Sequence, residues 1–402
     1  MRIAFLSNEF VIEKPDSGGL GNYLNRITQV LARQGHDVEL FVTKYKKNTP
    51  DYLNYNGVSV YHVPILKNHR YHYLRKLDKL FLKSPWWALS EYYGIASSLA
   101  LKLEERHAVL PFDAVQSTNC AAAGLFVKSN ISRPHIVRLS SIRELGLSTD
   151  GFLKSVGGRL LIYLENKSVS KGNLIYAPCA FTANYYKNKK KKNVHVIRPP
   201  YFNEFIHADI SHLNLPDRYM IHFGSIGRVK GSDLLAEALK LVWQKAPEFS
   251  MLWLGKERKG GEMKEYRSLW GDFSRNIIWF EGMIKSELYP LIQKAEASVL
   301  PSRIDNLPNT IIESLSLQTP VIAFNGASVD EMVEHGKSGL LVEMGNVEEL
   351  ANAILYAWNH RGIWLENGFQ RPVILDEMLP ENAAHNLLEM IAKVKDKNVA
   401  KL

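Results

Sequence analysis

The chain alternates short apolar runs of strand length with longer amphipathic segments of helical length. An apolar run at residues 2–7 precedes a glycine-rich turn at 17–21 and a helical pattern over 23–31. Gly35 ends that pattern, and residues 38–42 begin a second buried strand. The N-terminal part is therefore predicted to begin with a strand–helix–strand unit.

The same order of elements returns about halfway along the chain. A strand is predicted at residues 218–224, a turn at Gly227 and Gly231, a helix at 233–246 and a strand at 249–255. The apolar strands are long, and no two-residue hairpin turn is expected between strands. We therefore expect an α/β protein with two facing Rossmann-like domains. Each is predicted to be a parallel sheet with helices on both faces, and the ligand cleft is expected between them.

The domain limits follow from local breakers. A chain of 402 residues is long enough for two domains. Two consecutive prolines after a strand predicted at 194–198 disfavour helix there, so the first domain is assigned residues 1–200 and the second 201–375. Residues 376–402 are predicted to contain a C-terminal helix that packs on either domain, and a crossing back to the N-terminal domain is one of the two arrangements.

Composition narrows the class of protein. With 46% hydrophobic and 23% charged residues, the chain resembles an ordinary globular protein rather than a disordered or fibrous one. The formal charge of +9 favours anionic partners such as phosphate groups, acidic lipids or nucleic acid. Cys120 and Cys179 lack the spacing of a disulfide framework or a zinc site. The N-terminus has no signal-peptide pattern and no apolar run is long enough to span a bilayer, so we expect a cytoplasmic location with at most peripheral membrane contact.

The segment at residues 298–324 carries the most informative chemical pattern. An apolar strand ends at Pro301, a polar loop follows, and a helix is predicted to begin near Asn309. The backbone amides of Asn309, Thr310 and Ile311 are expected to be unpaired and to suit a phosphate or a sugar hydroxyl. The alternative is that Asn309 or Thr310 only caps the helix.

Two acids bracket this loop and the first turns of the helix. Glu313 is placed to accept hydrogen bonds from a ribose diol, whereas Asp305 is either a ligand contact or a solvated loop acid. The motif DNLPNTIIE, with acids at 305 and 313, resembles the acidic pair motif of glycosyltransferase family 4. The stretch at 319–354 also runs in that family's usual order, and the similarity extends over most of residues 1–360.

The resemblance implies a GT-B fold and a retaining hexosyltransferase that uses a nucleotide-sugar donor. It also implies that Glu313 holds the donor ribose and that Asp305 contacts the transferred sugar as a catalytic residue. The family's commonest form has Glu at the first acidic position, so Asp305 shortens the reach of this side chain by one methylene.

A second candidate site lies in residues 223–231, where a strand ends in a glycine-rich turn. Gly224 and the cations Arg228 and Lys230 suit a diphosphate, since charge builds up on the leaving nucleotide as the glycosidic bond breaks. A solvated basic turn is the alternative. Many family members place an arginine five residues before the lysine, where this chain has Ser225, so Arg228 is the candidate replacement.

Two turns of the N-terminal half are also candidates. Gly18 and Gly19 lie between the first strand and helix, where glycine permits close approach of a ligand, and the resemblance places this loop beside the donor's phosphate or sugar. The order GxGxxG of a dinucleotide site is missing. After a strand predicted to end near Gln116, Thr118 occupies the position of a family histidine, with Asn119 next. A hydrogen bond from Thr118 or Asn119 to the sugar is a hypothesis for this turn.

Arg138 and Ser141, at the end of the following strand, either line the same cleft or have a structural role. Base recognition is assigned to the glycines Gly255 and Gly282 and, from the resemblance, to the backbone after Gly282 at Met283. A UDP-, GDP- or ADP-sugar fits this pattern, and no cofactor is implied. No two aspartates stand two apart, so activity without a metal ion is predicted.

Two basic segments remain. Residues 67–87 combine six Lys or Arg with Leu74, Leu77, Phe81 and two tryptophans, a pattern compatible either with a helix at an anionic membrane surface or with ordinary core packing. Residues 187–193 are interpreted as a solvated loop, and no nucleic acid partner is expected, because aromatic platforms for bases are missing there.

Two function classes therefore compete. The first is a glycosyltransferase that acts on a glycan or a lipid-linked acceptor in polysaccharide or glycolipid biosynthesis. The second is a catalytically silent partner that keeps the fold and binds nucleotide or scaffolds an enzyme; Ser225 and Thr118 favour it, whereas the acidic pair and Lys230 favour the enzyme. An epimerase or a phosphorylase on the same double fold is a further alternative.

Overall fold

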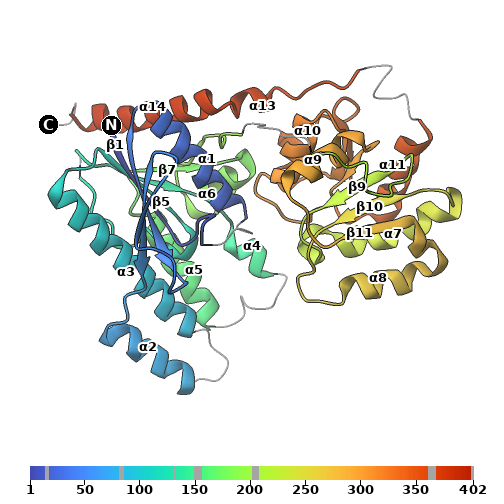
Figure 1. Ribbon diagram of the computed structural model, residues 1–402. Helices are drawn as coiled ribbons and strands as arrows, with labels where there is room; N and C mark the ends of the chain where they lie inside the picture. Colours follow the sequence, from blue (N-terminus) through green and yellow to red (C-terminus); the bar gives the residue numbers. More distant parts are fainter. Residues whose placement is uncertain are drawn as a thin grey trace. The chain divides into compact units, whose positions relative to one another are not determined.

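The computed structural model describes residues 1–13, 18–80, 86–130, 132–148, 156–201, 208–360 and 368–399. The chain divides into two compact units (Figure 1). The N-terminal unit comprises Met1–Phe202 together with Glu377–Leu402, and the C-terminal unit comprises Asn203–Asp376. Each unit is an α/β structure built on one sheet.

The described strands of the N-terminal unit form a sheet in the order β3-β4-β2-β1-β5-β6-β7-β8. They are β1 (Arg2–Ser7), β2 (Asp37–Lys44), β3 (Tyr52–Tyr55), β4 (Val58–Pro64), β5 (Ala114–Thr118), β6 (His135–Arg138), β7 (Leu174–Ala177) and β8 (His195–Val196). The helices are α1 (Gly19–Arg33), α2 (His69–Leu80), α3 (Trp86–Val109), α4 (Arg143–Ser148), α5 (Val156–Val169), α6 (Ala180–Lys190) and α14 (Pro380–Val399), with a 3-10 turn at Cys120–Ala122. The strand order of this sheet reverses between β1 and β5, as in other open α/β sheets in which strands and helices alternate.

One pair of strands in this sheet is antiparallel. β3 and β4 form a hairpin through Asn56 and Gly57, whose φ angles are 52° and 84°. Asn-Gly is the sequence that a two-residue hairpin turn with two positive φ angles favours. The prediction that the chain has no two-residue hairpin turn is therefore wrong.

Helices cover both faces of the N-terminal sheet. Side chains of α1 pack on one face against β1 and β2, and α14 joins them there through Ala384, Leu387 and Ile391. Helices α3 and α5 pack on the other face. Figure 1 shows α14, in red, beside α1, in blue, although the two helices are almost the whole chain apart in sequence.

The C-terminal unit contains a parallel sheet in the order β11-β10-β9-β12-β13-β14. Its strands are β9 (Met220–Phe223), β10 (Met251–Leu254), β11 (Ile277–Phe280), β12 (Ser298–Val299), β13 (Val321–Phe324) and β14 (Gly339–Val342). Its helices are α7 (Ser232–Lys245), α8 (Glu262–Trp270), α9 (Lys285–Lys294), α10 (Asn309–Ser316) and α11 (Val347–Asn359), with 3-10 turns at Arg228–Lys230, Gly271–Asn276 and Val329–Glu331. The short helix α13 (Ile374–Glu377) ends where the chain returns to the N-terminal unit. The strand order reverses between β9 and β12.

Several predicted boundaries move. The strand expected over 194–198 is reduced to β8, and the strand ending at Pro301 is reduced to β12. β5 continues two residues past Gln116, to Thr118. The segment Cys120–Ala122 that follows is a 3-10 turn and not an α-helix, because Ala121 and Ala122 have positive φ angles that an α-helix does not contain.

Candidate functional site

The candidate site of the C-terminal unit lies where its strand order reverses. β9 and β12 are neighbours there, and the segments that follow them leave the same edge of the sheet on opposite faces. The turn after β9 is residues 224–231, and the loop after β12 is residues 300–308. Ligands of open α/β sheets bind beyond the carboxyl ends of the strands at such a reversal.

These two segments bring Lys230 and Asp305 together. The Nζ of Lys230 forms an ion pair with Oδ2 of Asp305, and the side chains are 26% and 18% exposed. The other oxygen of Asp305 accepts a hydrogen bond of 2.9 Å from the backbone N–H of Asn306. The cation and the acid that the sequence assigned to separate parts of a donor are therefore in direct contact.

Arg303 holds this arrangement in place. Its guanidinium donates to both carboxylate oxygens of Asp233, at 2.5 and 2.9 Å, and to the carbonyl of Arg228 at 2.5 Å. Its backbone N–H donates to the carbonyl of Val229 at 3.0 Å. The loop after β12 is thereby fastened to the turn that carries Lys230. Sequence reasoning missed Arg303 and Asp233; their signal is an arginine two residues before the acid and an acid in the first turn of α7.

Arg228 does not join this pair. Its side chain is 77% exposed, and its Nε lies 3.9 Å from Asp233. Ser225 is half-buried in the same turn. The structure therefore brings Lys230 to Asp305 but leaves Arg228 exposed to solvent. Arg228, the candidate replacement for the family arginine, faces Asp233 in the first turn of α7.

The N-terminus of α10 borders the same turn. Helix α10 begins at Asn309, as expected, and its cap residue Pro308 offers no side-chain hydrogen bond. The N–H of Ile311 donates to the carbonyl of Pro308 at 3.2 Å, so the expectation that this amide is unpaired is wrong. The N–H groups of Asn309 and Thr310 have no acceptor among the described residues. Neither of these two residues caps the helix, and their amides remain suited to an anion.

Glycines let the turns after β9 and β10 approach each other and α10. A Cβ added at Gly224 would lie 3.7 Å from Cγ2 of Thr310, and one added at Gly255 would lie 1.7 Å from the carbonyl oxygen of Gly224. Gly255 has a φ of +151°, a conformation that side chains rarely adopt. Gly282 is exposed and Met283 half-buried at the end of the neighbouring strand β11. The structure thus places these predicted residues along one edge of the sheet.

Glu313 is buried and held by helix α9. Only 6% of the residue is exposed. Its Oε1 accepts from the hydroxyl of Tyr289 at 3.3 Å and lies 3.1 Å from Nζ of Lys285. These two contacts fix the direction in which the carboxylate points.

A buried histidine joins the two central strands beneath the site. Nδ1 of His222, on β9, is 2.7 Å from the carbonyl oxygen of Val299, on β12. Burial, together with the smaller effect of the nearby positive charge of Lys230, lowers the pKa of His222 to about 4. His222 is therefore neutral at physiological pH and has a structural position under the ion pair.

In the N-terminal unit, Gly18 and Gly19 are exposed at the start of α1. Thr118 is 3% exposed; its hydroxyl donates to Ser140 at 3.0 Å and accepts from the N–H of Cys120 at 3.2 Å. Asn119 is fully buried and bonds the turn after β6. Both side chains brace two turns against each other, so a direct sugar contact would require Thr118 to exchange partners.

Comparison with known proteins decides the family. Residues 217–360 match the family described as Glycosyl transferases group 1, and residues 18–200 match the Glycosyl transferase 4-like domain. The two matches are consecutive and together include every described strand of the two sheets except β1. This chain is a glycosyltransferase of the family 4 type.

Curated relatives of this glycosyltransferase agree with that assignment. It is 22% identical over 383 residues to a D-inositol 3-phosphate glycosyltransferase of Pseudarthrobacter chlorophenolicus, which covers 88% of this chain and 86% of that protein. It is 23% identical over 153 residues to an uncharacterised glycosyltransferase of Haemophilus influenzae, and this match covers 38% of the chain and 42% of that protein.

Solved structures show the fold. The glycosyltransferase superposes on HepE of Anabaena, crystallised in complex with UDP, with a TM-score of 0.72 at 18% identity, over 98% of this chain and 100% of that one. The GT-B fold expected from the resemblance is confirmed. No helix among the described residues of the glycosyltransferase is long and apolar enough to span a membrane.

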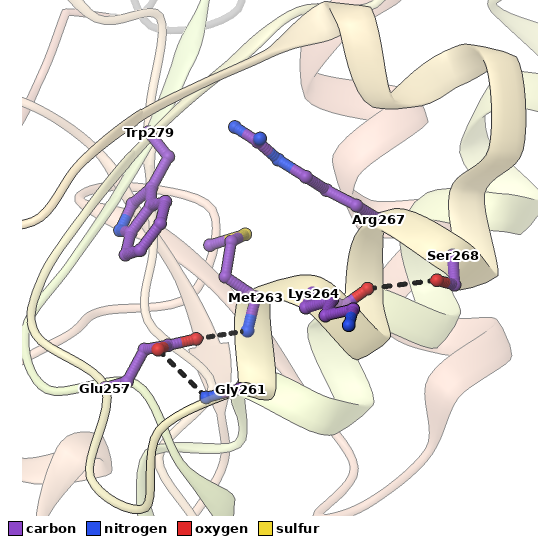
Figure 2. A pocket seen from close by; sticks show the side chains of 7 residues that line it. All are labelled: Glu257, Gly261, Met263, Lys264, Arg267, Ser268 and Trp279. Atoms are coloured by element: carbon purple, nitrogen blue, oxygen red, sulfur yellow. Dashed lines mark hydrogen bonds between the residues drawn. The ribbon is translucent and has the colours of Figure 1, made fainter.

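Figure 2 shows a pocket lined in part by the segment that follows β10. It has a volume of about 430 Å³ and lies between α8 and Trp279 of β11. The indole N–H of Trp279 donates to the carbonyl of Gly255 at 3.1 Å, and Glu257 accepts from the N–H groups of Gly261 and Met263 at 3.0 and 2.6 Å. These bonds fix the backbone that follows β10, next to the edge assigned to the base.

Proposed function

We propose that this glycosyltransferase moves a hexose from a nucleotide-sugar donor to a glycan or lipid-linked acceptor with retention of the anomeric configuration. The observation that carries the proposal is the ion pair between Lys230 and Asp305 at the strand order reversal, beside the amides of Asn309 and Thr310, which have no acceptor among the described residues. A cation, an acid and helix N-terminal amides together match a sugar joined to a diphosphate.

The proposed chemistry exchanges partners within this pair. The donor diphosphate takes Lys230 and the amides of Asn309 and Thr310, and Asp305 is then free to accept hydrogen bonds from the sugar hydroxyls. Glu313 holds the ribose diol. Negative charge grows on the leaving diphosphate as the glycosidic bond breaks, so the contact with Lys230 strengthens in the transition state and lowers the barrier.

We further propose a UDP-sugar as the donor and activity without a divalent ion. The likeness to HepE, whose structure was solved with UDP, supports the choice of base over GDP and ADP. The protein itself offers Lys230 and helix amides to the diphosphate, which is the task a metal ion has in other transferases.

Calorimetric titration of the purified chain with UDP, GDP and ADP, with magnesium and with EDTA, tests the donor assignment. At 100 times its dissociation constant a ligand specific to the folded state adds about 2.7 kcal/mol of stability, so a thermal shift provides an independent readout. A shift with UDP that EDTA leaves unchanged is expected. No binding of any of the three would contradict the proposal.

Lys230→Ala tests the mechanism. We expect kcat to fall roughly 100-fold, because a charge-assisted contact to the leaving diphosphate is worth about 3 kcal/mol. Lys337→Ala is the matched control, since Lys337 is 54% exposed and pairs with Glu334 on the surface of the same unit. Equal activity of the Lys230 and Lys337 variants would disprove the role of Lys230.

The silent-partner and epimerase alternatives differ in product. UDP-glucose incubated with the enzyme in water should give slow release of glucose that retains the α configuration at first formation, as seen by NMR. A new sugar nucleotide would indicate an epimerase, and binding without any turnover would indicate a silent partner.

We also propose that the N-terminal unit contacts an anionic membrane at its cytoplasmic face through α2 and the start of α3. Tyr73 is 64% exposed and Trp87 47% exposed, and α2 exposes the cations Arg70, Arg75 and Lys76. Residues 81–85, with Phe81, lie outside the described residues, as do the side chains of Leu77 and Trp86. Aromatic side chains beside cations are typical of a helix that lies in the headgroup layer.

Sedimentation with vesicles tests this surface. Binding to vesicles that contain phosphatidylglycerol, and not to pure phosphatidylcholine, is expected, and the double substitution Tyr73→Ser and Trp87→Ser should reduce it. If neither the wild-type protein nor the double variant sedimented with either kind of vesicle, the proposal would be contradicted.

A further inference from the structure

Arg138 is a buried cation without a carboxylate partner. The residue is 5% exposed, and among the described residues no acid lies within ion-pair distance of it. One terminal nitrogen donates to the hydroxyl of Ser140 at 2.7 Å. Its Nε is buried and has no hydrogen-bond partner. Burying a charge this way is unfavourable unless an anion or several hydrogen bonds compensate it.

The position of Arg138 is fixed by a polar network beneath it. Its guanidinium carbon lies 3.9 Å from the centroid of the Tyr23 ring. The hydroxyls of Tyr23 and Tyr176 are 2.7 Å apart, and the side-chain amide of Gln116 donates to Tyr23 at 3.1 Å and accepts from Tyr176 at 3.0 Å. Because these hydroxyls bond to one another, they offer Arg138 an aromatic face and not a negative charge.

Tyr23 belongs to the second turn of α1, so the guanidinium of Arg138 packs against a side chain of that turn. The cap residue is Gly18, which has no side chain to accept a hydrogen bond from the first amides of the helix. The first backbone hydrogen bond of α1 runs from the N–H of Asn22 to the carbonyl of Gly18 at 3.3 Å. The amides of Gly19, Leu20 and Gly21 therefore precede the first bonded turn and have no acceptor in the described part of the chain.

Arg138 and the start of α1 both follow strands of the N-terminal sheet at the edge where its strand order reverses. β1, which leads to α1, and β5 are neighbours, and β6, which ends at Arg138, lies next to β5. A fixed guanidinium and unpaired helix amides are complementary to an oxyanion. We propose that Arg138 and the first turn of α1 form an oxyanion site, which binds a phosphate or carboxylate group carried by the acceptor.

This inference rests on the proposed function, because it assigns a substrate class to the same enzyme: acceptors that carry an anionic group. The diphosphate of the donor is the other source of the same chemistry. The affinity for UDP distinguishes the two sources. If the site binds the donor diphosphate, replacing Arg138 must lower the affinity for UDP. If the site binds the acceptor, the affinity for UDP must not change.

The test measures binding of inorganic phosphate by calorimetry to enzyme already saturated with UDP. Wild type is expected to bind phosphate, and Arg138→Met to bind it at least about 10-fold more weakly, because charge-assisted hydrogen bonds are lost. UDP affinity is expected to stay within about twofold. Arg33→Met is the matched control, since Arg33 is exposed at the other end of α1.

Arg138→Lys covers the case in which the methionine variant does not fold. It keeps the charge but not the planar fork, so phosphate binding should weaken severalfold while UDP binding is unchanged. Equal phosphate binding by wild type and the Arg138 variants would overturn the proposal, as would absent phosphate binding in wild type. A parallel loss of UDP affinity would assign Arg138 to the donor. Failure of wild type to bind UDP would instead contradict the proposed function.

Discussion

The acid Glu313 is held between a tyrosine and a lysine of the neighbouring helix, and that restraint has an energetic consequence. Tyr289 and Lys285 fix the direction of its carboxylate, so the ribose diol that we propose to bind there would meet an oriented acceptor. We predict that Glu313→Gln raises the dissociation constant of UDP roughly 10- to 100-fold. This range corresponds to the loss of about 1.5–3 kcal/mol, the usual contribution of hydrogen bonds to a charged group. Calorimetry measures this change.

Glu334→Gln is the control for that substitution, because Glu334 is a half-exposed acid of the same unit that pairs with Lys337. Its UDP affinity should equal that of wild type. An unchanged dissociation constant in Glu313→Gln would remove Glu313 from the donor site.

Two buried histidines give the stability of the protein a defined pH dependence. Burial lowers the pKa of His135 and of His222 to about 4, below the unfolded value of about 6.5. The unfolded chain therefore takes up protons first as pH falls below 6.5, and the folded state loses stability until about pH 4. At pH 5 the loss is about 2 kcal/mol for each histidine.

Urea unfolding at pH 7 and pH 5 checks this expectation. In His222→Gln the difference between the two pH values should shrink by about 2 kcal/mol, since glutamine does not titrate. A pH dependence identical to that of wild type would show that His222 contributes nothing to it.

At this scale the sequence predicted residue types but not their partners. Lys230, Asp305 and Glu313 stand in recognisable motifs, whereas Arg303 and Arg138 do not. The significance of Arg138 comes from burial without an acid, and that of Arg303 from its bonds to Asp233 and the turn at Arg228. Burial and long-range pairing are properties of the folded chain and are absent from local spacing.

At the scale of elements, the close approach of strand ends depends on single glycines. Gly231 has a φ of +70°, and a Cβ there would lie 1.8 Å from the carbonyl oxygen of Pro301. We predict that Gly231→Ala destabilises the protein by roughly 3–4 kcal/mol, through the sum of backbone strain and overpacking, and weakens UDP binding because the turn carrying Lys230 must move.

Gly336→Ala separates the two contributions. Gly336 has a φ of +80° with open space around it, so only the backbone term of about 1 kcal/mol is expected. Chemical denaturation measures both variants. Similar losses of stability in the two would show that the contact with Pro301 does not constrain residue 231.

The elements themselves were largely readable from the sequence. The helix and strand repeats near residues 23, 233 and 251 lie where periodicity placed them, because apolar spacing records which face a helix buries. The hairpin at Asn56 and Gly57 was missed although its turn sequence was present, and the turn at Ala121 and Ala122 gave no signal. Alanine is a helix former, so only tertiary packing explains its positive φ there.

At the scale of the whole molecule, the C-terminal helix completes the core of the unit in which the chain begins. Leu387 of α14 is 2% exposed and packs in the cluster that contains α1 and β1. We predict that Leu387→Ala lowers the free energy of unfolding by about 2–5 kcal/mol, the effect of a cavity in a core. Thermal and urea unfolding measure the loss.

Leu379→Ala is its control, because Leu379 is 43% exposed just before α14, and a change within about 0.5 kcal/mol is expected. If the two leucine variants proved equally stable, the packing of α14 on the N-terminal unit would carry no weight in the stability of the protein.

The sequence by itself determined the class of this protein: two α/β sheets, the motifs at the ends of their strands, and the resemblance to a glycosyltransferase family. These follow from patterns that are local, since apolar periodicity and turn residues act over a few neighbours. The tertiary structure decided which motif side chains meet. Lys230 reaches Asp305, Arg228 does not, and Arg138 is buried against Tyr23 of α1. These contacts depend on strand order, because a parallel sheet places the ends of distant segments at one edge and excludes water from the groups between them.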